Sequence, residues 1–514
     1  MALRARHIAR NVLFNWIATL ANMAAGFFVA PFIVHRLGSV AYGVWVLAIS
    51  VVTYLSLLDL GMQSSVLRFV SKGYTQGDHQ AASDTISAAL WVRVQISALV
   101  VLLSVGLAIG FPIWFKIPPE MAMEARKAVL LIGATTALTL SLGVFGGVLS
   151  GLNRYDLQSL ITLTNTAVRI TGVVLVLVTG HGIVAIAACE FVAAVVSNVL
   201  LIIVARRLYP ALRVRLSKPR KEVLRQIQSY SFYAFLTTVA VQLVYQTDNM
   251  VVGAFVSAAA VTFYAIGNSL CRYAGQIISS MTLTFVPAAS TYEAAGDMAG
   301  LRNLYCNGTR ATLAVALPIL VTLMLRGRTF IRLWMGPEYA HRSGTVLIIL
   351  ASALFFSYAN RVASSIAFGI EKHKTSALWS IGEGVSNLVL SVILVHWFGI
   401  YGVAIGTLIP SLVVHLCLWP FYIPKLVPIR TSQVVLQIWC PMFLSAVPFA
   451  IASYAVDAYF PTRHMVIFFL QVAATLPIFI VTVGIIFRQS VRQHVLPRLR
   501  SFFAPPQAPE ELAP

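Results

Sequence analysis

Long apolar runs separated by short polar stretches dominate the chain from residue 12 to residue 487. A helix needs about 20 apolar residues to cross the hydrocarbon core of a bilayer, and several of these runs reach that length. Runs of this length do not match the short alternating strands of a membrane barrel, so we expect an all-α membrane protein with about 14 transmembrane helices. The predicted spans are 12–34, 43–67, 85–113, 128–150, 158–179, 183–205, 228–256, 260–286, 304–325, 343–368, 375–397, 401–423, 435–458 and 464–487.

The composition agrees with a membrane protein. Of the 514 residues, 59% are hydrophobic and 11% are charged, whereas a soluble domain carries about 25% charged residues. The five cysteines lie in or beside apolar runs, without a spacing that suits a disulfide or a metal site. We therefore expect no metal and no cofactor. The first apolar run is too long for a cleaved signal peptide, so it is predicted to remain as the first helix.

The most basic stretch of the chain lies near its middle, at 206–225. It carries eight Lys or Arg residues and a single acid, Glu222. A segment this basic is hard to move across a bilayer, so it is predicted to be a cytoplasmic linker. The net charge of +20 is of the kind that collects in cytoplasmic loops, and no aromatic platform accompanies the stretch. We therefore expect no nucleic-acid partner.

Lys and Arg residues are unevenly divided between the two sides of this topology. With a cytoplasmic N-terminus, 23 of them fall on the inside and 9 on the outside. This excess predicts that both termini are cytoplasmic. The two longest outer loops are then expected at 114–127 and 326–342.

Two stretches 218 residues apart resemble each other. Gly151-Leu-Asn-Arg-Tyr precedes one apolar run, and Gly369-Ile-Glu-Lys-His precedes another. Each unit would contain six spans, an even number, so the two units would have the same orientation in the membrane, as in transporters built from parallel repeats. The predicted domains are a six-helix bundle, a basic cytoplasmic linker, a second six-helix bundle, two extra transmembrane helices and a cytoplasmic tail, at 1–205, 206–227, 228–424, 425–487 and 488–514.

A family resemblance is carried by two stretches, 15–68 and 246–270. Both resemble the polysaccharide transporter family, the lipid-linked oligosaccharide flippases of the multidrug/oligosaccharidyl-lipid/polysaccharide exporter superfamily. Phe263 departs from the pattern, because a Gly often stands before the Tyr. The similarity covers roughly residues 10 to 425, and its motifs specify the superfamily better than the cargo. The matching residues are Leu37-Gly38, Tyr42-Gly43, Asp248, Gly253 and Tyr264.

This resemblance implies a transporter rather than an enzyme. It implies two bundles around a central cavity that opens alternately to each side of the membrane. The cargo would be a polyprenyl-diphosphate-linked oligosaccharide, moved from the cytoplasmic to the outer leaflet for cell-surface or exopolysaccharide synthesis. The implied location is the bacterial cytoplasmic (inner) membrane. The implied partners are the lipid-linked glycan, membrane lipids, a polysaccharide polymerase and export machinery.

Nine charged side chains fall inside the predicted spans. Each costs about 2.5–3.5 kcal/mol at the centre of a lipid-facing helix, so most are expected to face the bundle interior or a wet cavity. The nine are the acids Asp59, Glu190, Asp248 and Glu383 and the arginines Arg93, Arg169, Arg272, Arg310 and Arg361.

The five arginines are the candidate substrate-binding residues, because a guanidinium suits bidentate capture of phosphate. Arg169 and Arg272 each lie about twelve residues inside their spans, near the midplane. Arg93, Arg310 and Arg361 lie nearer the cytoplasmic side. Two alternatives to substrate binding stay open. Arg93, Arg310 and Arg361 could extend to the inner lipid headgroups, or the arginines could form hydrogen bonds between helices of one bundle.

Three acids are candidates for ion coupling or for a counter-ion, namely Asp59, Asp248 and Glu383. Each aspartate could bind a coupling cation or neutralise an arginine, and we favour the ion pair. His396 and His415 are further candidates for carrying a proton, although a lone membrane His is more often a packed polar residue.

Alternatives to the oligosaccharide flippase come from two classes. A cation-coupled multidrug exporter of the same superfamily would be expected to have an acidic cavity. A lipid II flippase would suit fourteen spans and a cationic cavity. A membrane enzyme, such as a polysaccharide polymerase, would need a larger outer loop or a soluble domain. The sequence contains no Walker A motif and no nucleophile elbow, which disfavours ATP-driven transport by this chain alone.

Overall fold

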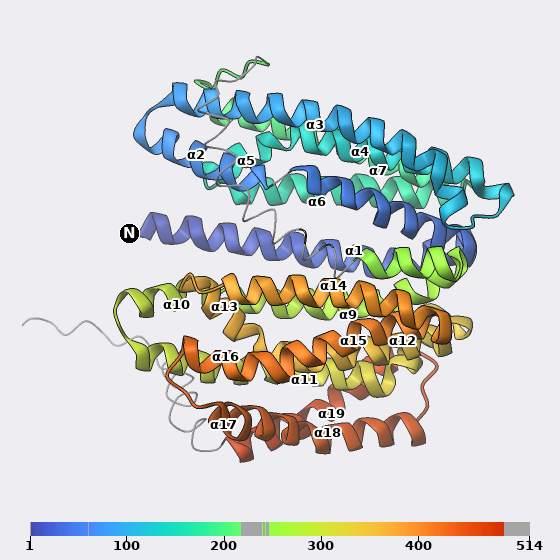
Figure 1. Ribbon diagram of the computed structural model, residues 1–514, viewed down its shortest axis with the longest axis vertical. Coiled ribbons are helices and arrows are strands. Elements are labelled where there is room, and N and C mark those ends of the chain that lie inside the picture. The colour runs from blue at the N-terminus through green and yellow to red at the C-terminus, as the bar shows by residue number, and fades with distance from the viewer. Residues whose placement is uncertain (1, 60, 217–238, 240–241, 243–245, 488–514) are drawn as a thin grey trace, which may run out of the picture. The chain divides into compact units, whose positions relative to one another are not determined.

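A computed structural model describes residues 2–59, 61–216, 239, 242 and 246–487. Every regular element among these residues is a helix (Figure 1). Eleven of the described helical segments are long and apolar enough to cross a membrane. The all-α membrane fold expected from the sequence is therefore confirmed, and the chain is a multi-pass membrane protein.

The eleven segments account for twelve of the fourteen predicted spans. The first two spans both lie in α1 (Ala2–Thr53), which consists of two helices that meet at a kink at Gly38, where φ 78° and ψ 169° are not helical. The predicted span 228–256 lies mostly outside the described residues. The span 260–286 corresponds to α9 (Ala258–Thr282), which is a helix but is not among the eleven. The number fourteen stays a prediction.

The chain divides into two compact units. Unit 1 contains Met1–Ser269 and Thr375–Pro410, and unit 2 contains Leu270–Lys374 and Ser411–Pro514. The domain boundaries expected from the repeat stay a prediction, and the tail at 488–514 lies outside the described residues.

Unit 1 is built around long helices that pack side by side. After α1, the chain forms η1 (Tyr54–Asp59) and then α2 (Met62–Gln76), with a break at Gly61. α3 packs on α4, α4 on α7, and α6 on both α7 and α1 (Figure 1). The other helices of this unit are α3 (His79–Trp114), α4 (Pro119–Leu142), α5 (Val144–Gly151), α6 (Tyr155–Val178), α7 (Ile183–Leu208), α14 (Lys374–Phe398) and α15 (Ile400–Leu412).

Close packing in unit 1 depends on glycine at the motif residue Gly43. A Cβ added there would overlap the main-chain carbonyl of Ala258 at the start of α9. The neighbouring contact is a hydrogen bond of 2.5 Å from the Thr262 hydroxyl to the carbonyl of Ser39. The Tyr42-Gly43 motif thus has a physical role, because it lets two helices approach at backbone distance.

α5 and α13 (Arg361–Gly369) end in turns of the same geometry. Asn153 and Glu371, which are 218 residues apart, both adopt a left-handed conformation, with φ 55° and 57°. The next residue in each turn, Arg154 or Lys372, donates its amide to a carbonyl five residues back. The sequence similarity at this offset therefore corresponds to a repeated backbone conformation.

The starts of α3 and α11 (Met298–Trp334) repeat as well. Asp78 and Asp297 cap these helices, and the carboxylate of each accepts the amide three residues on, at 2.9 and 2.7 Å. Gly77 and Gly296 precede them with φ 71° and 66°. The same cap at the same place in both halves supports an internal duplication.

Unit 2 consists of the second half of α9 and the later helices, apart from α14 and α15, which belong mainly to unit 1. α11 packs on α12 and on α18, α18 packs on α19, and α10 packs on α13. These elements are α10 (Phe285–Ala294), α12 (Pro337–Ser357), η2 (Tyr358–Asn360), η3 (Val413–Leu418), α16 (Trp419–Leu426), α17 (Thr431–Val434), η4 (Val435–Trp439), α18 (Cys440–Tyr459) and α19 (Met465–Ile486). Of these, η3 and η4 are π-helices.

The prediction of two long outer loops is wrong in the extent of both loops. The segments 114–127 and 326–342 are mostly helical, because α4 begins at Pro119 and α12 begins at Pro337. Proline suits the first turn of a helix, where its missing N–H would have no partner anyway.

Arg326 was among the residues expected in an outer loop, but it lies fully buried on α11. Its Nε is 3.2 Å from Oδ1 of Asp457 on α18, and its Nη2 donates to Gln471 on α19. Its guanidinium carbon also lies 4.6 Å from the ring centroid of Phe468. This buried network attaches the two extra C-terminal helices to α11.

Candidate functional site

Arg93 and Asp59 form a buried ion pair in unit 1. Arg93 lies on α3 and is 3% exposed, and its Nη2 is 2.7 Å from Oδ1 of Asp59 at the end of η1. The same nitrogen donates to Oε1 of Gln63 at 3.1 Å. A Cβ on Gly143, which separates α4 from α5, would lie 3.7 Å from Nη1. Arg93 therefore lies beside the breaks in two helices, and its charge is balanced by Asp59.

Replacing Arg93 by Gln is expected to destabilise the protein, because it leaves the Asp59 carboxylate buried without a counter-ion. Breaking a buried pair in this way costs about 3–5 kcal/mol. The double variant Arg93→Gln/Asp59→Asn should recover much of this loss, since it removes both charges. Thermal unfolding in detergent and abundance in the membrane measure the effect. If Arg93→Gln kept full stability but lost transport, Arg93 would act on the cargo instead.

Arg169 lies on α6 and contacts polar groups of two other helices. Its Nη2 donates to Oδ1 of Asn22 on α1 at 3.2 Å. Its Nη1 is 3.5 Å from Oε1 of Glu190 on α7, and the two side chains are 30% and 29% exposed. The charge of Arg169 is thus partly balanced, while the group stays accessible.

Arg272 and Arg310 belong to unit 2. Arg272 is exposed on α9 and takes part in none of the ion pairs between described residues. Arg310, on α11, contacts neutral groups: its Nη2 donates to the carbonyl of Gln437 at 3.5 Å, and its guanidinium lies 4.8 Å from the ring centroid of Phe487.

Arg361 is the first residue of α13 and is half-buried. Its Nη2 donates to Oγ of Ser279 on α9 at 2.7 Å. It also takes part in none of the ion pairs that the described part of the chain contains. Under the 218-residue offset, Arg361 occupies the position of Gly143. Each unit thus places a guanidinium at the break of this helix, bound to a carboxylate in unit 1 and to a hydroxyl in unit 2.

Asp248 lies in a cluster of neutral hydrogen-bond donors in unit 1. It belongs to the helical segment 246–255 and is 3% exposed. Its Oδ2 accepts the hydroxyl of Tyr264 at 2.5 Å and the hydroxyl of Thr407 at 3.0 Å. None of the ion pairs between described residues includes Asp248. Its other oxygen, Oδ1, is buried without a hydrogen-bond partner in the described part of the structure.

The cluster continues onto α14. The Thr407 hydroxyl also lies 3.3 Å from Oδ1 of Asn387, which is 1% exposed and accepts the Ser391 hydroxyl at 2.9 Å. Glu383 is half-buried one turn before Asn387, on the same face of α14. The motif residue Asp248 therefore meets Thr407 of α15, which lies 159 residues further along the chain. Thr407 in turn contacts Asn387 of α14.

The two histidines lie in different surroundings. His396 is exposed near the end of α14, with its ring centroid 5.1 Å from that of Phe255. His415 lies in η3, and its main-chain carbonyl accepts Nδ2 of Asn360 at 3.0 Å.

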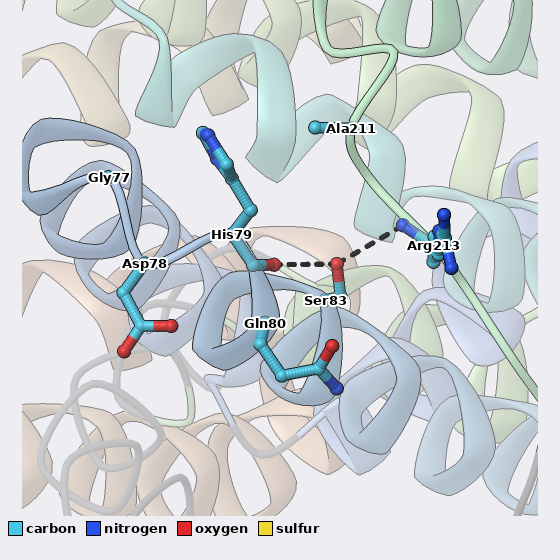
Figure 2. Close-up of a pocket in the computed structure, with 7 residues that line it drawn as sticks. All are labelled: Gly77, Asp78, His79, Gln80, Ser83, Ala211 and Arg213. Atoms are coloured by element: carbon cyan, nitrogen blue, oxygen red, sulfur yellow. Dashed lines mark hydrogen bonds between the residues drawn. The ribbon is translucent and has the colours of Figure 1, made fainter.

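A separate cavity of about 380 Å³ lies at the turn between α2 and α3, as Figure 2 shows. Here Ser83 donates to the carbonyl of His79 and accepts the amide of Arg213, at 2.7 and 3.1 Å. Nδ1 of His79 is also 2.6 Å from the Tyr209 hydroxyl, whose pKa is raised by burial. No candidate arginine lines this cavity. Its contacts fix the start of the basic linker against α3, and the remainder of the linker lies outside the described residues.

The fold is that of a known class of membrane transport protein. The structure titled "Lipid II flippase MurJ, inward closed conformation" superposes with a TM-score of 0.73 at 16% identity, covering 94% of this chain and 100% of that one. At this identity the similarity establishes the fold alone.

Sequence comparison then gives the family. The profile described as "Polysaccharide biosynthesis protein" matches residues 8–293, so the chain belongs to that family. The "Uncharacterized membrane protein EpsK" of Bacillus subtilis is 27% identical over 421 residues, 81% of this chain and 83% of EpsK. The "Probable low-salt glycan biosynthesis flippase Agl15" of Haloferax volcanii is 20% identical over 450 residues, 84% of this chain and 87% of Agl15. The family resemblance noted in the sequence is confirmed.

Proposed function

We propose that this chain is a flippase that moves a polyprenyl-diphosphate-linked oligosaccharide from the cytoplasmic to the outer leaflet by alternating access. Family membership supports a role in polysaccharide synthesis, and the names of Agl15 and MurJ both contain the word flippase. The choice of cargo rests on Arg272 and Arg361. Neither arginine takes part in an ion pair between described residues. Guanidinium groups without a carboxylate partner in a membrane protein favour an anionic ligand.

The arginines have different proposed roles. Arg310 and Arg361, which lie nearer the cytoplasmic side, receive the diphosphate. Arg169 and Arg272 are the candidates for contact with it near the midplane. Arg93 belongs to an internal pair with Asp59 and contributes to stability rather than to cargo binding, because its charge is already balanced at 2.7 Å.

We assign ion coupling to Asp248 and its neighbours. A carboxylate this buried, held by neutral donors, is costly when charged, so it needs a proton or a bound cation. Glu383 lies one turn from Asn387 of the same cluster and is the second acid of this site. Asp59 differs from Asp248, because it already has a cationic partner.

The proposed location is the bacterial inner membrane with both termini in the cytoplasm. The Lys/Arg distribution supports this orientation. Single cysteines replacing Ser217 in the basic linker and His341, which is exposed near the start of α12, distinguish the two sides. An impermeant thiol reagent added to intact cells should label position 341 and leave position 217 unlabelled. The opposite pattern would invert the topology.

Deleting the gene tests the function directly. Cells should accumulate a polyprenyl-diphosphate-linked oligosaccharide on the cytoplasmic leaflet and lose the corresponding surface polysaccharide. Mass spectrometry of the extracted lipids identifies the intermediate. Accumulation of lipid II instead would favour the lipid II flippase. An unchanged lipid pool with increased sensitivity to cationic drugs would favour the multidrug exporter.

A further inference from the structure

We infer that Ser279 is a specificity-determining residue for the anion, because it places a neutral hydroxyl beside Arg361 where unit 1 places a carboxylate beside Arg93. The inference rests on the proposed function, which assigns Arg361 to the diphosphate. Asp59 gives Arg93 a counter-ion, whereas Ser279 gives Arg361 a hydrogen-bond acceptor without charge. The two units thus carry a closed and an open version of one guanidinium site.

The two guanidinium groups belong to equivalent places in the fold. In unit 1, a Cβ on Gly143 would lie 3.7 Å from Nη1 of Arg93, so this guanidinium lies against residue 143. The matching turns at Asn153 and Glu371 set the 218-residue offset, under which Arg361 is the counterpart of Gly143. The arginine of unit 2 therefore begins at the position that the arginine of unit 1 reaches from α3.

The partners of the two arginines correspond as well. The capping residues Asp78 and Asp297 are 219 residues apart, which places the counterpart of Asp59 at residue 278, directly before Ser279. Asp59 ends η1, and Ser279 lies in the last turn of α9. Each partner therefore comes from the end of the helical segment that precedes α2 or α10.

The charged pair of unit 1 has neutral counterparts in unit 2. At the 219-residue offset, Arg93 corresponds to Thr312 and Asp59 to Ile278, and both of these side chains are buried. The cation of unit 2 is supplied by α13 instead. None of the ion pairs between described residues includes Arg361, so its charge has no carboxylate there.

The two sites also differ in access. Arg93 is 3% exposed, whereas Arg361 and Ser279 are both half-buried. Nη2 of Arg361 donates to Oγ of Ser279 at 2.7 Å, which orients the guanidinium but does not balance its charge. An anion can therefore gain at Arg361 the charge-assisted hydrogen bonds that Asp59 already takes in unit 1. A carboxylate at residue 279 would compete with that anion.

The test measures binding of farnesyl diphosphate to the purified full-length protein in detergent, with farnesol as the neutral probe. Ser279→Asp should weaken farnesyl diphosphate binding about tenfold or more, because its carboxylate takes the charge-assisted hydrogen bonds of Arg361. Its affinity for farnesol should stay unchanged. Ser279→Asn introduces a neutral side chain of nearly the same size, so it should weaken diphosphate binding much less.

Ser280→Asp is the matched control. Ser280 is the next residue of α9, and its hydroxyl donates to the carbonyl of Ile277 in its own helix at 2.7 Å. The carboxylate of Ser280→Asp adds the same charge on another face of α9. The affinity of Ser280→Asp for farnesyl diphosphate should therefore stay close to that of the wild type.

Two further measurements show whether the carboxylate acts through Arg361. The double variant Ser279→Asp/Arg361→Gln should bind farnesyl diphosphate no more weakly than Arg361→Gln alone, because the two residues act through one contact. Ser279→Asp should also unfold at a temperature no lower than that of Ser279→Asn, since its carboxylate gains a cationic partner.

Equal losses of diphosphate binding in Ser279→Asp and Ser280→Asp would overturn the inference, since the added charge alone would explain them. Equal effects of Ser279→Asp on both probes would overturn it too, as would earlier unfolding than Ser279→Asn, because each indicates a structural disturbance. If Arg361→Ala removed the preference for the diphosphate and Ser279→Asp kept it, the inference alone would fail. A wild type that does not distinguish the two probes would overturn the proposed function as well.

Discussion

Replacing Arg361 or Arg272 by Ala is expected to lower export of the lipid-linked glycan about a hundredfold while protein abundance stays normal. Each substitution removes charge-assisted hydrogen bonds to the diphosphate, and such donors commonly contribute this much. The abundance of each variant in the membrane should stay normal, because in the described structure neither arginine balances a carboxylate. The measurement is surface polysaccharide per molecule of membrane-inserted protein in a deletion strain.

Lysine substitutions separate charge from geometry. Arg361→Lys should restore export only partly, because Lys keeps the charge but loses the planar fork. Full activity of Arg361→Lys would mean that the positive potential alone matters. Arg328→Ala is the control, since this exposed arginine donates to Thr345 within unit 2 and has no assigned role in the cargo path. Normal export by both Arg361→Ala and Arg272→Ala would contradict the assignment of phosphate binding.

Replacing Asp248 by Asn is expected to abolish ion-driven transport. The side-chain amide introduced by Asp248→Asn would still accept hydrogen bonds from Tyr264 and Thr407, so the fold of the cluster should persist. It would have no site for a proton and would bind a cation far more weakly, because the negative charge is gone. Proteoliposomes with an imposed sodium or proton gradient measure the effect. The wild type should respond to one of the two gradients, and Asp248→Asn to neither.

Two further variants make this test specific. Thr407→Val should weaken the response, because it removes one donor to the carboxylate at nearly constant volume. Asn249→Ala is the control in the same helical segment, since Asn249 donates to Ser50 at 3.1 Å and is not part of the Asp248 cluster. A gradient response of Asp248→Asn equal to that of the wild type would assign coupling to another group.

The helical architecture was predictable, because the bilayer requires long apolar runs and those are visible in the sequence. The repeat was also visible, and the structure adds matching turns at Asn153 and Glu371. Helix ends were less predictable: Pro119 and Pro337 begin helices inside segments expected to be loops. The sequence signal was present, since proline favours the first helical turn.

The partners of the charged residues could not be predicted. Asp59 and Asp248 are both aspartates in apolar runs, yet one pairs with Arg93 and the other has only neutral donors. Their difference depends on tertiary contacts, because the residue that faces each carboxylate comes from another helix. Thr407 was missed for the same reason, since a single Thr in an apolar helix carries little signal.

The most direct measurement uses purified protein in liposomes and follows the translocation of a fluorescent polyprenyl-diphosphate glycan. The rate is compared with that of an analogue in which a neutral linker replaces the diphosphate. The proposed function predicts that the wild type moves the diphosphate compound at least tenfold faster than the neutral analogue. It also predicts that Arg361→Ala loses this preference. Equal rates for the two compounds, or a preference that survives Arg361→Ala and Arg272→Ala together, would contradict recognition of the diphosphate by these arginines.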